Sequence, residues 1–181
     1  MRFLSLSAAR ERSFDCERWS RLESTASWSD TSDDRFVHDS YSVRFVGNFE
    51  TARDALLAYR IFPPNRMFPK VSTPDATVAL GATIIQRIVL GPLAIETAVR
   101  VINVQISSDR ASFAYATVRG HPEHGIASFG LTRQGDKVEF EAQAWSRSGT
   151  WLTRLGRPVS RWLQKALTRQ AVAFFAGSAG Q

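Results

Sequence analysis

The densest cluster of side chains able to do chemistry is the run His121-Pro122-Glu123-His124. Two imidazoles and a carboxylate are groups that zinc accepts as ligands, and either His121 or Glu123 could serve as a general acid or base. The proline and the short turn expected here make it difficult for all three groups to converge on one ion. A hairpin in which these groups bond to the backbone is the favoured interpretation, so no metal is expected.

Two other polar side chains are better candidates for a binding pocket. Tyr115 lies in a strand-like run, although a tyrosine in such a run is more often a core aromatic residue with one bonded hydroxyl. Arg147 follows a strand whose apolar side chains should point inward, and Gly149 allows the chain to turn there. Arg147 could bend over a pocket mouth and hold a carboxylate or enolate oxygen by paired hydrogen bonds. An exposed arginine at a strand end is the competing interpretation.

The remaining candidates are weaker. Glu139 and Glu141 share a strand face and could divide acid and base roles, but Gln143 and Arg147 continue that face, which indicates a solvated surface. Cys16 has no histidine near it in the sequence, so a nucleophilic role is not expected. A single cysteine fits a reducing compartment, and a cytoplasmic location is predicted. The sequence has no glycine-rich phosphate loop, and no cofactor is expected.

Composition and charge place the chain among ordinary globular domains. Of its 181 residues, 44% are hydrophobic and 22% are charged, which excludes a mostly disordered chain or a collagen-like repeat. No apolar run approaches the ~18 residues that a membrane-spanning helix needs. The net charge is +6, and residues 142–181 contain no Asp or Glu. A local excess of positive charge can indicate an anionic partner.

The spacing of apolar residues predicts the elements that must position these side chains. Residues 1–35 show no clean period and are predicted to form a loosely ordered N-terminal segment with a short helix around 17–24. Residues 36–46 alternate like a strand, and Asn48 suits the N-cap of a short helix. Four prolines between 63 and 76 predict a loop. Five further strands are predicted, at 77–90, 93–106, 111–118, 125–132 and 137–147.

Pro158 suits the first turn of a long C-terminal helix that runs to about residue 176. The order of elements predicts an α+β fold, in which a curved antiparallel sheet carries a short first helix and this long helix on one side. A long helix across a curved sheet leaves room for a pocket. The residues expected to line it are Tyr115, Phe140, Ala142, Arg147, Trp151 and Trp162.

Residues 113–123 read Phe-Ala-Tyr-Ala-Thr-Val-Arg-Gly-His-Pro-Glu. This run resembles the signature of an uncharacterised family of bacteria and plants, the domain-of-unknown-function family number nineteen-ninety. Weaker matches support the resemblance, which covers roughly residues 36–175; they lie at 47–50, 55–57, 144–147, 151–152 and 156–164.

The sequence departs from that family pattern at three positions. Ala116 replaces a glycine, and Ile126 and Ala127 replace two glutamates, so any function of those carboxylates is not expected here. The family is similar to the helix-grip superfamily of START-type lipid-binding domains, birch-pollen-allergen-like proteins and polyketide cyclases. The resemblance therefore implies a helix-grip domain over residues 36–181.

Two functional hypotheses follow. In the first, the chain binds a small apolar or aromatic organic molecule between the sheet and the C-terminal helix, either as a carrier or as a cofactor-free cyclase or dehydratase-like enzyme. In the second, it is an interaction module with a filled core whose basic C-terminal helix contacts an anionic partner such as nucleic acid or a membrane surface. No nucleic-acid-binding motif is present, so DNA is not expected. A cavity of ~300 Å³ or more would favour the first hypothesis.

Overall fold

The computed structural model describes residues 3–5, 13–65, 67–90, 93–148 and 169–178. One antiparallel sheet runs in the order β2-β8-β7-β6-β5-β4-β3, and β1 also pairs with β5. The strands are β1 (Phe3–Ser5), β2 (Val37–Val46), β3 (Met67–Val71), β4 (Thr83–Leu90), β5 (Leu93–Ile106), β6 (Arg110–Thr117), β7 (Glu123–Gln134) and β8 (Lys137–Ser148). The helices are α2 (Cys16–Ser20), the 3-10 helix η1 (Trp28–Ser32) and α3 (Phe49–Leu57), and residues 169–178 are also helical.

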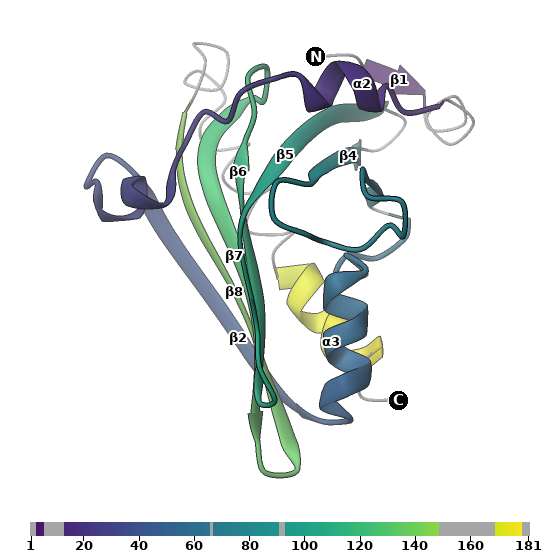
Figure 1. Cartoon of the computed structure of the whole chain (residues 1–181), viewed down its shortest axis with the longest axis vertical. Helices are drawn as coiled ribbons and strands as arrows, with labels where there is room; N and C mark the ends of the chain where they lie inside the picture. Colours follow the sequence, from purple (N-terminus) through teal and green to yellow (C-terminus); the bar gives the residue numbers. More distant parts are fainter. Residues whose placement is uncertain (1–2, 6–12, 66, 91–92, 149–168, 179–181) are drawn as a thin grey trace.

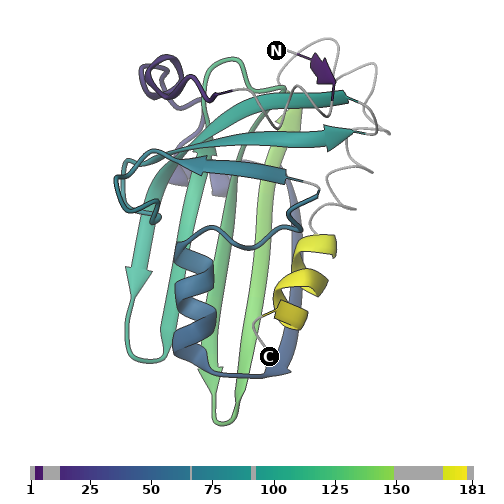
Figure 2. The ribbon, with the colours of Figure 1, turned by 90° about the vertical axis from the view of Figure 1, so that its right-hand side faces the viewer.

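The sheet is curved, and its two faces are covered by different parts of the chain (Figure 1). Helix α3 and the helical residues 169–178 both lie on the inner face, and in Figure 2 both stand in front of the sheet. The N-terminal segment with α2 and η1 lies on the outer face and at the upper end. The predicted fold class, a curved antiparallel sheet with a short first helix and a C-terminal helix against it, is confirmed. The predicted start of that last helix at Pro158 lies outside the described residues.

Aromatic rings form the centre of the inner face. Phe113 and Phe129 are direct partners across β6 and β7, with ring centroids 5.5 Å apart. Phe140 of β8 continues the row, and Phe175 of the C-terminal helix stacks on it at 4.3 Å between centroids. Such ring pairs contribute roughly 0.5–1.5 kcal/mol each beyond the apolar area they bury. These contacts fix the last helix against the middle of the sheet.

The largest differences from the sequence-based prediction of the main sheet are at β3 and β4. The proline-rich stretch predicted as a loop contains strand β3, which is possible because β3 is the edge of the sheet, where Pro69 need not donate to a further strand. Strand β4 begins at Thr83 rather than at residue 77. Before it, the Val78 amide bonds to the Leu57 carbonyl at 2.7 Å, and Gly81 adopts a φ of 80° that interrupts extended backbone.

A buried ion pair fastens the N-terminal segment to the outer face. Arg87 Nε of β4 donates to Glu96 Oε2 of β5 at 2.8 Å, and both side chains are buried. Trp19 Nε1 of α2 donates to Glu96 Oε1 at 3.0 Å. The Arg87 guanidinium also donates to the Ser13 carbonyl at 2.8 Å and lies over the Phe14 ring at 3.9 Å. Both charges therefore have partners that come from the N-terminal segment.

Backbone hydrogen bonds hold the next stretch of that segment beside β6. The Thr25 amide donates to the Thr117 carbonyl at 2.7 Å, and the Arg119 amide donates to the Glu23 carbonyl at 2.9 Å. Residues 13–35 thus follow a defined course along the sheet. The division of the chain at residue 35 stays a prediction.

We expect Glu96→Ala to lower the free energy of unfolding by ~3–5 kcal/mol, because it leaves the Arg87 charge buried without its carboxylate. Urea unfolding measures this loss. The matched control is Glu139→Ala, which removes the carboxylate of a pair with the exposed Arg44 and should cost at most ~1 kcal/mol. Equal losses in the two variants would contradict a structural role for the buried pair.

Candidate functional site

Tyr59 ends helix α3 in a conformation that is unusual for a bulky residue. Its φ is 56°, in the left-handed region, where glycine is the common choice. The Tyr59 amide donates to the Leu56 carbonyl at 3.0 Å, and the Arg60 amide donates to the Ala55 carbonyl at 2.9 Å. These two bonds form a Schellman motif. A non-glycine residue here costs about 1–2 kcal/mol, so the fold bears a backbone strain that directs this tyrosine into the core.

The Tyr59 hydroxyl lies in a small polar cluster on the inner face. Gln86 Nε2 of β4 donates to the Tyr59 hydroxyl at 2.6 Å. The ring of Tyr115 on β6 lies 6.4 Å from the Tyr59 ring, centroid to centroid, and both Tyr59 and Gln86 are close enough to lower the pKa of Tyr115. Thr97 of β5 is the direct partner of Gln86 in the sheet register. Its hydroxyl is buried and has no hydrogen-bond partner. The cluster thus offers two phenols, one amide and one unpaired hydroxyl inside an otherwise apolar face.

Both phenols are protonated at neutral pH, and burial makes their ionisation still less favourable. It raises the pKa of Tyr59 well above the ordinary value of 10.0, and the neighbouring Tyr115 raises it further. Burial also raises the pKa of Tyr115, against hydrogen bonds from Tyr59 and Gln86 that lower it. Neutral phenols in a site of low polarity are good hydrogen-bond donors and poor bases. The cluster can therefore bind an acceptor oxygen, or stabilise negative charge that develops on one.

Apolar rings surround this polar cluster. The Tyr59 ring lies 5.9 Å from both Phe62 and Phe113, and the Tyr115 ring lies 5.8 Å from Phe129, centroid to centroid. Tyr115 itself is only partly buried. An aromatic wall beside a few convergent polar groups is the usual composition of a site for a small organic molecule.

The structure places three of the predicted pocket residues on this inner face. Tyr115 belongs to the polar cluster, whereas Phe140 and Ala142 of β8 are buried in the apolar core. Phe140 is covered directly by Phe175, so its ring is part of the packing between helix and sheet. Trp151 and Trp162 lie outside the described residues.

Arg147 does not turn toward the inner face. Its guanidinium lies over the Phe36 ring, 5.2 Å from the centroid, on the outer side of β8. Counting by twos along β8 puts Arg147 on the face opposite to Phe140 and Ala142, and the structure has its side chain on that face, against Phe36, rather than bent over an inner pocket. The physical reason is the attraction between the cation and the face of the Phe36 ring, with the nearby Asp33 adding electrostatic attraction.

His121 lies in the turn between β6 and β7, and Glu123 is the first residue of β7. His121 Nδ1 accepts a hydrogen bond from the Glu123 amide at 3.1 Å. Burial lowers the pKa of His121 from 6.5 to about 4, so the ring is neutral at pH 7. This geometry agrees with the interpretation of this run as a hairpin whose polar side chains bond to the backbone. Within the described residues, no group of three His, Cys, Asp or Glu side chains could hold a metal ion.

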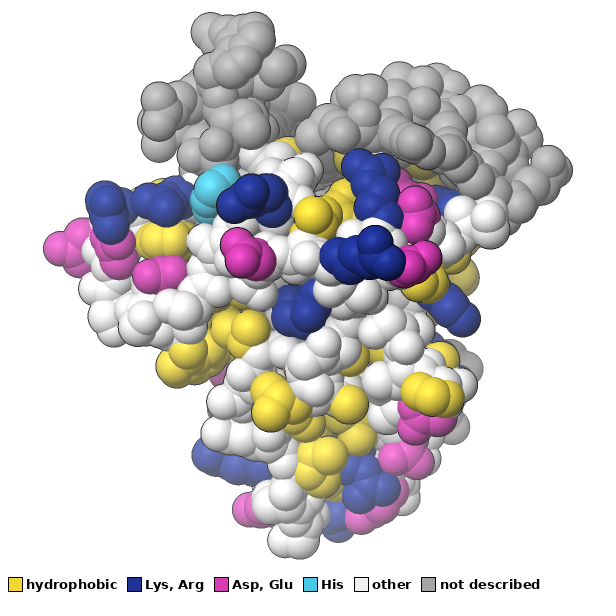
Figure 3. All heavy atoms as spheres, turned by 45° about the horizontal axis from the view of Figure 1, so that its top comes forward, with side chains coloured by type: hydrophobic (Ala, Val, Ile, Leu, Met, Phe, Trp, Pro, Cys, Tyr) yellow, Lys and Arg dark blue, Asp and Glu magenta, His cyan; other side chains and the backbone are white. Residues whose placement is uncertain are grey.

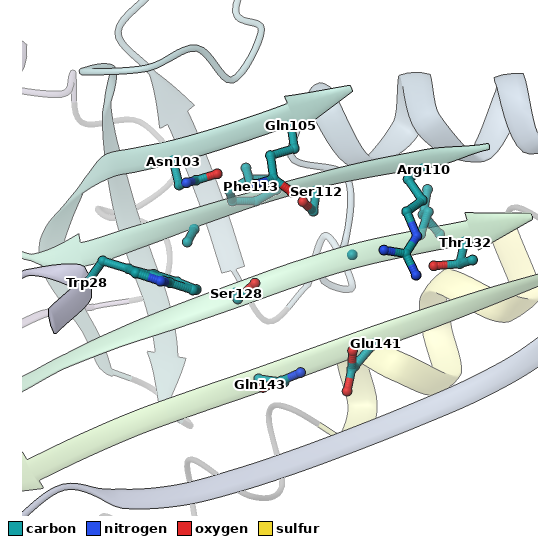
Figure 4. Close-up of a pocket in the computed structure, with 13 residues that line it drawn as sticks. Trp28, Asn103, Gln105, Arg110, Ser112, Phe113, Ser128, Thr132, Glu141 and Gln143 are labelled. Carbon is teal, nitrogen blue, oxygen red and sulfur yellow. The ribbon is translucent and has the colours of Figure 1, made fainter. Parts of the chain in front are cut away.

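The chain contains a cavity on the face opposite to the expected one. It has a volume of about 320 Å³ and lies on the outer face of β5, β6, β7 and β8, with Trp28 of η1 at one end (Figure 4). Its lining is mostly polar, in contrast to the aromatic inner face. The sequence predicts a cavity between the sheet and the C-terminal helix, so this outer-face cavity is not the predicted one.

Sequence reasoning missed Tyr59, Gln86 and Thr97 as site residues. Tyr59 fits the apolar stripe of α3, and nothing in its spacing shows the left-handed backbone that redirects its ring. Gln86 did carry a signal, because an amide inside the apolar run of β4 must find a buried partner. No signal in the sequence distinguishes Thr97 from an ordinary strand threonine.

A pH dependence of stability follows from the His121 environment. A histidine whose pKa falls on folding contributes stability that is fully present above about pH 6.5 and is lost as the pH falls toward 4. We expect the wild type to lose about 2–3 kcal/mol from this source over that interval. His121→Asn, which keeps an acceptor near the Nδ1 position, should show a flatter profile in urea unfolding at several pH values. Parallel profiles for the two proteins would show that His121 is not the group responsible.

Comparison with known proteins gives both a family and a fold. Residues 24–174 match the family described as Domain of unknown function (DUF1990). No curated protein matches the sequence. None of the described helices is long and apolar enough to cross a membrane.

Several solved structures share the architecture at low sequence identity. The di-domain ARO/CYC protein BexL from the BE-7585A biosynthetic pathway superposes with a TM-score of 0.57 at 12% identity, over 84% of this chain and 52% of that one. Major latex-like protein 151 from Panax ginseng has a TM-score of 0.51 at 10% identity, over 77% of this chain and 97% of that one.

Norcoclaurine synthase from Thalictrum flavum, solved in complex with dopamine and hydroxybenzaldehyde, has a TM-score of 0.51 at 9% identity, over 80% of this chain and 89% of that one. These likenesses show the fold alone. Because the family match covers most of the sequence, the chain belongs to the DUF1990 family, and its fold is the helix-grip fold.

Proposed function

We propose that this protein binds a small apolar or aromatic organic molecule on the inner face of the sheet, with an oxygen of that molecule accepting a hydrogen bond from Tyr115. The observation that carries the proposal is the Tyr59–Gln86–Tyr115 cluster, held in place by strained backbone at Tyr59. Strain and buried polar groups both lower stability, and they concentrate at functional sites. The unpaired hydroxyl of Thr97 beside Gln86 is a second polar group available to a ligand.

The comparisons support the type of ligand. The norcoclaurine synthase structure holds two aromatic molecules, dopamine and hydroxybenzaldehyde, in a helix-grip fold. BexL, named as an ARO/CYC protein, shares the same architecture. By analogy of fold, the inner face between α3 and the C-terminal helix is the place for an aromatic molecule here. The cytoplasmic location predicted from the single cysteine stays part of this proposal.

Carrier and enzyme differ in what the tyrosine cluster does. A carrier needs only a neutral donor that orients the ligand. A cofactor-free cyclase or dehydratase-like enzyme needs negative charge on an oxygen to be stabilised in the transition state, and two neutral phenols can do this. Both roles use the same atoms, so the same variants test both.

The alternative function, binding of an anionic partner by the basic C-terminal helix, has little support among the described residues. Arg169 lies over the Tyr41 ring, 5.7 Å from its centroid, and so packs against β2. The other basic residues of that predicted helix lie outside the described residues. On the face drawn in Figure 3, basic and acidic side chains alternate rather than forming one positive patch. An interspersed surface does not select polyanions.

The test begins with native mass spectrometry of the purified protein, where we expect a bound organic molecule. In parallel, anilinonaphthalene sulfonate serves as an aromatic probe whose fluorescence reports binding. Tyr115→Phe removes one hydroxyl and should weaken binding of the co-purified molecule about two- to tenfold, the scale of one hydrogen bond. A change in mass of that molecule on incubation with fresh protein would identify an enzyme rather than a carrier.

Tyr41→Phe is the matched control. Tyr41 also faces the inner side, but its hydroxyl makes no hydrogen bond with a described residue, so its loss should leave binding unchanged. Absence of both a bound molecule and probe fluorescence would refute the proposal. Salt-dependent binding to anionic vesicles or to nucleic acid would instead favour the alternative function.

A further inference from the structure

We propose that the outer-face cavity is a second, separate binding site, and that it takes an uncharged, hydroxyl-rich ligand, a short saccharide. The cavity lies on the opposite side of the sheet from the tyrosine cluster, so this inference goes beyond the proposed function and does not depend on it.

The floor of the cavity is open because four neighbouring outward positions carry small side chains. Ser112 and Ala114 of β6 lie directly across from Gly130 and Ser128 of β7. A Cβ atom at Gly130 would meet only Ser112 Cβ, at 3.6 Å, which is ordinary contact, so no backbone clash requires glycine here. Larger residues at these positions would fill the cavity of about 320 Å³, a volume at the lower end of small-molecule sites.

Unpaired polar side chains form part of this floor and surround the rest of it. Across the part of the chain that the structure describes, the side chains of five lining residues make no hydrogen bond to any other residue; they are Asn103, Gln105, Ser112, Ser128 and Thr132. Gln143 Oε1 accepts a hydrogen bond from His38 Nε2 at 3.3 Å, which leaves the amide NH₂ of Gln143 available at the cavity (Figure 4). Amides and hydroxyls each combine donor and acceptor atoms, as do the hydroxyls of a sugar.

Trp28 supplies the apolar contact that a sugar ring also needs. It is 49% exposed, yet its position is fixed by an edge contact with Trp145 at 5.9 Å between ring centroids. The Ser27–Asp30 capping box of η1 also holds the turn that presents it. Figure 4 shows the indole at one end of the cavity, extending over the strand that carries Ser128. A rigid exposed indole provides a flat surface for the C–H face of a sugar at low entropic cost.

The charges around the cavity balance. Arg110 and Thr132 lie at the end away from Trp28, and Glu141 lies on the neighbouring strand (Figure 4). One cation and one carboxylate do not favour an anionic ligand over a cationic one, and both can bond to hydroxyl groups. This balance, together with the amides and the indole, is why the ligand class is a neutral saccharide rather than a phosphate or an organic acid.

The test uses the full-length protein and a panel of mono- to tetrasaccharides of glucose, galactose, mannose and N-acetylglucosamine, each at millimolar concentration. Saturation-transfer NMR detects the bound sugar, and amide chemical shifts locate it. We expect at least one sugar to bind and to shift the amides around Ser112, Ser128 and Gly130. Trp28→Ala should weaken that binding at least about tenfold.

Ser128→Leu fills the floor and should abolish sugar binding. Ser42→Leu makes the same change on the same face, but on the edge strand β2 outside the cavity, and should leave binding intact. Circular dichroism and thermal unfolding check that each variant is folded. Tyr115→Phe should not affect sugar binding, and Ser128→Leu should not affect the inner-face ligand, so failure of one site is distinguishable from failure of the other.

Two results would overturn the proposal. The first is that no sugar of the panel binds the folded wild type. The second is that Ser128→Leu binds the sugar as tightly as Ser42→Leu, which would place binding elsewhere on the surface.

Discussion

The row of packed aromatic rings across the inner face is the contact on which the rest of the structure depends. It begins at Phe113 and Phe129, continues through Phe140, and ends on Phe175 of the C-terminal helix. Because these rings cover the middle of the sheet, the space left for polar chemistry is displaced toward β4, β5 and the end of α3. Tyr59 can reach this region only because α3 ends in a left-handed residue. Packing thus decides where the polar cluster lies.

The outer face is organised by a different part of the chain. The N-terminal segment satisfies the buried Arg87–Glu96 pair and then runs beside β6, which brings Trp28 to the end of the outer cavity. Without this segment, the outer face of the strands would be a polar surface with no side chain closing one end of the cavity. The segment that the sequence marks as irregular is therefore what turns a sheet face into a concave site.

Much of the fold could be predicted because strand alternation and capping are local signals. The strands β2 and β5 to β8 and the Asn48 cap of α3 follow from such signals. The site was harder to predict from the sequence, because it depends on three-dimensional geometry that residue types and their spacing do not determine. One backbone angle directs the Tyr59 side chain into the core. Arg147 packs on the Phe36 ring instead of bending toward the inner face. The outer cavity exists because Gly130 and its neighbours have small side chains or none. From the sequence, a strand face with polar side chains is interpreted as solvent-exposed, whether that face is flat or contains a cavity.

The pairing of the first long strand with the last has a consequence for synthesis. Strand β2 pairs with β8, and Trp19 bonds to Glu96, 77 positions further along the chain. A ribosome releases the chain from its N-terminal side, so β2, Phe14 and Trp19 emerge long before their partners exist. The apolar side chains of β2 stay exposed until β8 is complete, and Phe14 and Trp19 stay exposed until β4 and β5 have formed. Contacts between such distant positions form slowly. We therefore expect the nascent chain, rather than the finished protein, to be the form that depends most on chaperones.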